Sequence, residues 1–115
     1  MHPSPEQIDD FTLDDADHVL DYDPIIEHGG HQAGGCIPGK DEFPVGWGRV
    51  EVKAWVDAIL ARPSAISPGR WQNSFAFRGT HEGVHGVVWV RSTGIRDSWY
   101  IATAYPQPLY VRWPS

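Results

Sequence analysis

The apolar positions along the chain change their spacing about halfway through. Over about 13–20 and again over 49–61 they recur every three or four residues, which is the period of an amphipathic helix. Thr12 precedes the first of these segments and is a favourable N-cap. The second segment ends at Arg62 because the residue before Pro63 avoids helical geometry. We therefore expect two helices before residue 62.

The second half alternates apolar and polar positions as β-strands do. Segments 70–78, 84–90 and 99–105 are rich in β-branched and aromatic residues, and 109–113 can add an edge strand bounded by prolines. Segment 64–69 is expected to be a turn-rich connection. Two helices followed by three or four consecutive antiparallel strands predict an α+β domain.

A chain of 115 residues with 41% hydrophobic content can form one compact core. Residues 1–10 contain two prolines and no apolar periodicity, which predicts a flexible tail before a single domain at 11–115. No apolar run is long enough for a membrane-spanning segment. Cys36 is the only cysteine, which excludes an internal disulfide and favours a reducing compartment.

The net charge of −6 at first argues against a nucleic-acid partner. The distribution of charge changes this view. Nine acidic residues and no lysine or arginine precede Lys40, whereas nine basic and six acidic residues follow from Lys40 onward. An acidic arm and a mildly basic body are thus expected, with modest non-specific affinity for RNA.

A long glycine-rich loop carries the residues best suited to chemistry. Segment 28–48 has seven glycines and holds His28, His31 and Lys40, and His18 lies on the first expected helix. Cleavage of RNA at its own 2′-hydroxyl needs a base, an acid and a positive charge beside the phosphate. Histidine suits the first two roles because it titrates near neutrality, and lysine suits the third.

Structural roles compete with these functional ones. A single histidine is more often a surface or core residue than a catalyst, and we expect His81 and His85, at a predicted hairpin, to be structural or solvent-facing. The spacing of His28 and His31, with two carboxylates nearby, raises a metal site. Histidine ligands on one helix face are usually at least four residues apart, and the intervening glycines disfavour a helix, so no metal is expected.

Several motifs together suggest a family. They are HVLDYD from residue 18, GGH from 29, GK from 39, EFP from 42 and TAYP from 103. In this order and spacing the chain resembles the bacterial EndoU family of endoribonucleases over roughly residues 12–106. The resemblance implies an EndoU- or barnase-like α+β nuclease.

By this resemblance His18 and His31 are the acid–base pair and Lys40 is the cation. Thr103 and Tyr105 supply a hydroxyl and an aromatic ring to the uridine side of the cut. No cofactor is implied. The expected reaction is attack of a 2′-hydroxyl in single-stranded RNA, near uridine or in a tRNA loop. Its products are a 2′,3′-cyclic phosphate and a 5′-hydroxyl, and which histidine is the base stays open.

The resemblance also implies a biological setting. Such domains form the C-terminal toxic part of larger secreted bacterial proteins, act in the cytoplasm of the target cell and are blocked by a cognate immunity protein. Two other functions stay open. The first alternative is a non-catalytic acidic inhibitor that mimics RNA, as immunity partners do. The second alternative is a metal-dependent hydrolase that uses His28, His31 and an acidic residue.

Overall fold

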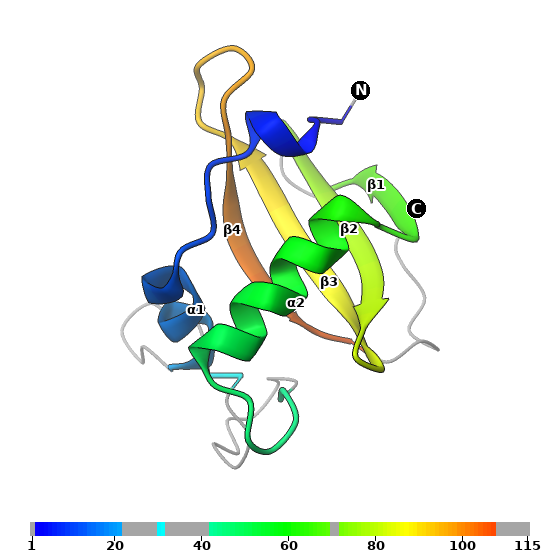
Figure 1. Cartoon of the computed structure of the whole chain (residues 1–115). Coiled ribbons are helices and arrows are strands. Elements are labelled where there is room, and N and C mark those ends of the chain that lie inside the picture. Colours follow the sequence, from blue (N-terminus) through cyan, green and yellow to red (C-terminus); the bar gives the residue numbers. More distant parts are fainter. Residues whose placement is uncertain (1, 22–29, 32–41, 70–71, 108–115) are drawn as a thin grey trace.

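The computed structural model describes residues 2–21, 30–31, 42–69 and 72–107. In chain order the elements are η1 (Pro5–Gln7), α1 (Leu13–Leu20), α2 (Arg49–Ala61), β1 (Ala65–Pro68), β2 (Ser74–His81), β3 (Val84–Ser92) and β4 (Trp99–Pro106). Both α-helices have the bounds that the apolar spacing predicted. The protein is α+β, with its helices preceding a four-stranded antiparallel sheet (Figure 1), which confirms the predicted class.

The sheet is a meander in the order β1-β2-β3-β4. β2 and β3 are joined through Glu82 and Gly83, whose φ values of 53° and 75° suit the type I′ turn that matches strand twist. The prediction of a turn-rich connection over 64–69 is wrong, because this segment contains β1. Pro68 is compatible with β1 because an edge strand tolerates proline. The expected edge strand at 109–113 lies outside the described residues.

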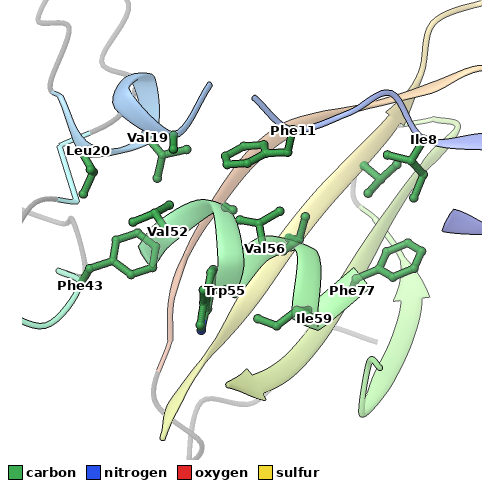
Figure 2. Packing of buried hydrophobic residues seen from close by; sticks show 14 residues of the cluster. Ile8, Phe11, Val19, Leu20, Phe43, Val52, Trp55, Val56, Ile59 and Phe77 are labelled. Carbon is green, nitrogen blue, oxygen red and sulfur yellow. The ribbon is translucent and has the colours of Figure 1, made fainter. Parts of the chain in front are cut away.

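α2 crosses one face of the sheet and supplies the centre of the core (Figures 1 and 2). Its buried residues recur at helical spacing and are Val52, Trp55, Val56 and Ile59. They form one hydrophobic cluster with Ile8, Phe11, Ala16, Val19, Leu20, Phe43, Phe77, Val88, Val90 and Ala104. Burial of each large apolar side chain contributes about 1.5–3 kcal/mol, so this cluster is the main source of stability.

Gly86 permits a close approach between α2 and the sheet. The Trp55 indole is fully buried, and its Nε1 donates a hydrogen bond of 2.9 Å to the Val84 carbonyl. A Cβ atom at Gly86 would lie 2.5 Å from Cζ2 of this indole and would also meet the Tyr105 carbonyl oxygen. Packing therefore requires glycine at position 86. Its backbone conformation does not, because its φ is not in the left-handed region.

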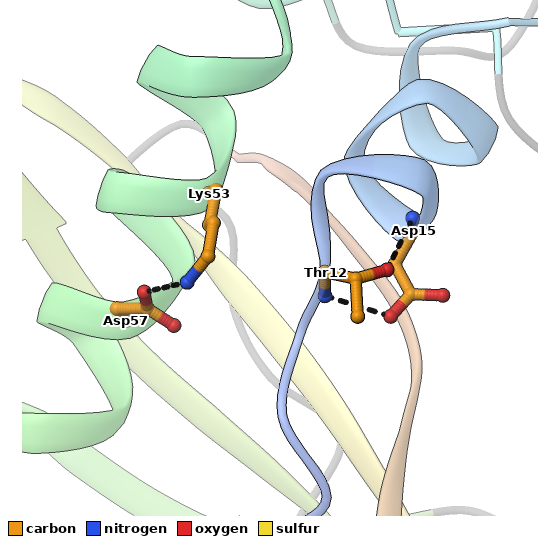
Figure 3. A network of polar contacts seen from close by, with 4 residues as sticks. All are labelled: Thr12, Asp15, Lys53 and Asp57. Atoms are coloured by element: carbon orange, nitrogen blue, oxygen red, sulfur yellow. Dashed lines mark hydrogen bonds and ion pairs between the residues drawn. The ribbon is translucent and has the colours of Figure 1, made fainter.

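α1 begins at a reciprocal pair of hydrogen bonds. The Asp15 N–H donates to Thr12 Oγ1 at 3.1 Å, and the Thr12 N–H donates to Asp15 Oδ2 at 2.9 Å (Figure 3). This capping box satisfies two donors at the helix terminus and fixes where the helix starts. Figure 3 also shows the exposed Lys53–Asp57 ion pair on α2, which contributes little because solvent screens it.

The segment before α1 lies against the sheet. Ile8 is 8% exposed and pairs in parallel with Trp99, and the Asp9 N–H donates to the Trp99 carbonyl at 2.9 Å. The arm thus joins the core at the start of β4. Flexibility of residues 1–10 stays a prediction, but the side chain of Ile8 belongs to the core cluster.

A β-bulge divides β4 into two parts. Trp89 pairs with Thr103 whereas Val90 pairs with Ile101, so Ala102 is the extra residue. Before the bulge Ile101 packs against the core beneath α2, and after it Ala104 does so. Thr103 and Tyr105 consequently belong to the face of the sheet opposite α2, where Tyr105 packs against a second buried cluster of Ala76, Val87 and Trp89.

Candidate functional site

Four of the five residues expected in the site lie in the described part of the chain. They are His18, His31, Thr103 and Tyr105. The structure brings them into two adjoining groups at β4, the edge strand beside α1. Lys40, the expected cation, and His28, the alternative metal ligand, lie outside the described residues.

The first group is a stack of two rings. The imidazole of His31 lies over the phenol ring of Tyr105, with centroids 5.2 Å apart and planes inclined by 15°. His31 is buried, with 4% exposure. Its backbone is held on both sides, because its N–H donates to the Val19 carbonyl at 3.2 Å and its carbonyl accepts from the Phe43 N–H at 2.7 Å. The stack therefore joins α1, the loop before α2 and β4.

Tyr105 is also held through its hydroxyl group. Trp89 on β3 donates its Nε1–H to the Tyr105 hydroxyl oxygen at 3.0 Å. A phenol that accepts one hydrogen bond keeps its own proton for donation. The ring position is thus fixed by His31 on one side and by Trp89 at its polar end, while the hydroxyl can still donate to a ligand.

The second group lines a pocket between α1 and the bulge of β4. His18 and Thr103 both line this pocket, which has a volume of about 100 Å³, and Asp15 contributes a carboxylate. Asp15 and His18 are three residues apart on α1 and so share one face of the helix. His18 is exposed, in contrast to His31. The apolar lining of the pocket comes from Phe11, Val19, Ile101 and Ala102.

Two backbone relations join the groups. The backbone N–H of His31 donates a hydrogen bond to the carbonyl of Val19, the residue directly after His18. Thr103 and Tyr105 are two residues apart on β4 beyond the bulge, so their side chains share one side of the strand. The arrangement gathers two imidazoles, an aliphatic hydroxyl and a phenol around one stretch of β4. These groups can exchange protons with a ligand and form hydrogen bonds to it.

The charges of the described chain are segregated between the sheet and its surroundings. The four strands contain Arg78, Arg91, His81 and His85 and no aspartate or glutamate. The described carboxylates lie instead on the arm, the helices, the loops and the turns. The sheet therefore differs in sign from the chain as a whole, whose net charge is −6.

Two residues of the candidate site were not expected from the sequence. Trp89 was read only as part of a strand, although the pairing of β3 with β4 places it beside Thr103 and within reach of Tyr105. Asp15 was not singled out from the sequence, although its spacing from His18 indicates a shared helix face. The helical spacing was available from the sequence, whereas the strand register was not.

The described residues contain neither a metal-binding cluster nor a membrane-spanning helix. No group of three or more histidine, cysteine, aspartate or glutamate side chains is placed there to hold a metal ion. No helix in the described ranges has the length and apolar character to cross a membrane. Comparison of the whole chain with protein-family models, with curated proteins and with solved structures found no match in any of the three.

Proposed function

We propose that the protein is an endoribonuclease that cleaves single-stranded RNA through attack of a 2′-hydroxyl. The observation that carries the proposal is the stack of His31 on Tyr105 beside the pocket of His18 and Thr103. Two imidazoles that lie beside one edge strand can supply the acid and the base that this reaction needs. The α+β fold with helices on one face of a four-stranded sheet is compatible with an EndoU- or barnase-like nuclease.

The two imidazoles can carry out both proton transfers of this reaction. One imidazole removes the proton of the 2′-hydroxyl, and the 2′-oxygen attacks the adjacent phosphorus. The bond from phosphorus to the 5′-oxygen breaks, and the other imidazolium protonates that oxygen. The products are a 2′,3′-cyclic phosphate and a 5′-hydroxyl. Thr103 and Tyr105 then hold the base upstream of the cut through a hydroxyl and a ring, and Lys40 is the proposed cation beside the phosphate.

The decisive experiment compares RNA oligonucleotides that contain uridine with matched oligonucleotides that carry 2′-deoxyuridine at the cut. Wild-type protein should cleave the first and leave the second intact, with EDTA present. His31→Ala should lower kcat by about 10²–10⁴-fold, the usual contribution of a general acid or base. His81→Ala is the matched control, because His81 lies at the β2–β3 hairpin and should leave kcat unchanged.

A second variant separates the ring of Tyr105 from its hydroxyl. Tyr105→Phe keeps the surface on which His31 stacks and removes the group that accepts from Trp89. We expect Tyr105→Phe to lower kcat/KM on uridine substrates but to cleave them faster than His31→Ala does. Equal activity of His31→Ala and wild type would overturn the site.

The other outcomes identify the alternative functions. Cleavage of the deoxy substrate would refute the cyclic-phosphate mechanism, and loss of activity in EDTA would favour the metal-dependent hydrolase. Inactivity toward every RNA, together with tight binding to a ribonuclease, would favour the acidic inhibitor. That inhibitor is supported only by the concentration of carboxylates outside the sheet.

The biological setting is a separate part of the proposal and rests on the sequence resemblance. We propose that the chain is the C-terminal toxic part of a larger secreted bacterial protein and acts in the cytoplasm of a target cell. A cognate immunity protein would block the site in the producing cell. Expression of the chain inside bacteria should then stop growth, and His31→Ala should not.

A further inference from the structure

A second polar cluster lies on the sheet face opposite α2, towards the β2–β3 hairpin. Thr80 and His85 are paired across β2 and β3, and Thr80 Oγ1 lies 2.8 Å from His85 Nδ1. Arg78 is two residues before Thr80 and so shares its side of β2. Because the Thr80 hydroxyl occupies Nδ1, Nε2 is the nitrogen of His85 that can meet a ligand.

This cluster adjoins the site through the strand register. Val87 pairs with Arg78 on one side and with Tyr105 on the other, so these three residues form one row across the sheet. His85 is two residues from Val87 and is therefore a diagonal neighbour of both Arg78 and Tyr105. Diagonal neighbours in a sheet lie about 7–8 Å apart, which long side chains can span.

The electrostatics of the cluster favour an anion. Burial lowers the pKa of His85, and the positive charge of Arg78 lowers it further. Burial also lowers the pKa of Arg78. A negative charge placed between the two side chains would offset both the burial of the Arg78 guanidinium and its repulsion of a protonated His85.

We propose that Arg78 and His85 bind a second phosphate of the RNA strand, next to the nucleotide held at Tyr105. The inference rests on the proposed function and extends it, because it makes the substrate a strand with at least two phosphates along the sheet. Arg78 provides a planar charged donor set suited to phosphate oxygens. His85 adds a donor at Nε2, held in orientation by Thr80.

The first test measures binding without cleavage. A fluorescent 2′-deoxyuridine octanucleotide is titrated with the full chain at several salt concentrations, and binding is followed by anisotropy. Loss of one phosphate contact flattens the plot of log K against log salt by about 0.7 for a single strand. Arg78→Gln should show this change and Arg78→Lys, which keeps the charge, should not. Arg96→Gln is the matched control, since its side chain is 96% exposed in the β3–β4 turn.

The second test measures the contribution to cleavage. A uridine-containing dinucleoside monophosphate is compared with the same substrate carrying an extra terminal phosphate at its 5′ or its 3′ end. The extra phosphate should lower KM about tenfold for wild type and not for Arg78→Gln, consistent with the strength of a charged hydrogen bond. Arg96→Gln should leave kcat/KM for both substrates unchanged, and His85→Ala should weaken the effect of the extra phosphate.

The outcomes distinguish this inference from the proposed function. If wild type cleaves RNA but Arg78→Gln matches Arg96→Gln in salt slope and KM, the second phosphate position is refuted and cleavage stands. If the salt slope depends on Arg78 but no RNA is cleaved, the phosphate position stands and the cleavage proposal fails. Absence of both binding and cleavage refutes both. Urea midpoints confirm that each variant is folded, and Arg78→Lys provides a folded reference with the charge retained.

Discussion

Gly86→Ala tests how much the close contact between α2 and the sheet contributes to stability. The added methyl group would lie 2.5 and 2.6 Å from two carbons of the Trp55 ring, about 1 Å closer than ordinary contact. The ring cannot easily move, because it is fully buried, hydrogen-bonded to the Val84 carbonyl and packed edge-on against Phe43. The new carbon also meets the carbonyl of Tyr105, so the main chain of β4 must shift as well.

The expected cost follows from these contacts. Overpacking of a core by one methyl group costs about 1–3 kcal/mol, and the rigid surroundings of Gly86 place it in the upper part of this range. Replacing glycine with alanine also restricts the unfolded chain, which returns about 0.4–1 kcal/mol. We expect a net loss of about 2 kcal/mol in the free energy of unfolding. For a domain of this size the melting temperature then falls by about 8 °C.

The sheet offers a matched control in the cross-strand partner of Gly86. Gly79 pairs with Gly86 on the same face, but its added carbon would lie 3.3 Å from the Ile59 side chain, which is tight and not prohibitive. Gly79→Ala should therefore change stability by less than about 1 kcal/mol. Urea unfolding followed by circular dichroism measures both variants. Equal midpoints for the two variants, or no loss in Gly86→Ala, would refute the packing argument.

Two further predictions concern local interactions. Thr12→Ala removes the side-chain oxygen that accepts from the Asp15 N–H and should lower the free energy of unfolding by about 1 kcal/mol in urea titrations; an unchanged midpoint would mean that the cap contributes nothing. Burial and the charge of Arg78 lower the pKa of folded His85, so the unfolded chain binds this proton more readily. Stability present above about pH 6.5, the ordinary histidine value, should be lost as pH falls from there through the lower pKa of folded His85. His85→Asn should show a shallower loss when urea midpoints are compared from neutral to mildly acidic pH. Identical pH dependence in the variant and wild type would contradict the second prediction.

The helices were predictable because the determinants of each are local. The cap at Thr12, the apolar spacing of α2 and the stop at Pro63 are all read from neighbouring residues. β1 was missed because Pro63 and Pro68 flank a segment too short to show alternation. It forms because β2 offers a partner, a fact that depends on tertiary structure and that no local pattern records.

The candidate site was only partly predictable, because it too depends on tertiary structure. His18 and His31 were selected by chemistry and Tyr105 by resemblance, but their grouping depends on long-range packing. The stack of His31 on Tyr105 joins residues 74 positions apart. The cluster of Arg78, Thr80 and His85 was not foreseen as a unit, because His85 was expected to be structural or solvent-facing and its bond to Thr80 follows from the hairpin register.

The bulge at Ala102 explains why a correctly predicted strand did not reveal which of its faces carries the proposed site. Trp99 and Ile101 pack towards the core, so regular alternation would send Thr103 and Tyr105 to the same face, beneath α2. One extra residue reverses this pattern, and Ala104 takes the core position instead. Tyr105 is thereby placed opposite α2, where it meets both Trp89 and His31. A single unpaired residue thus converts an ordinary half-buried strand into the element on which both proposed binding positions depend.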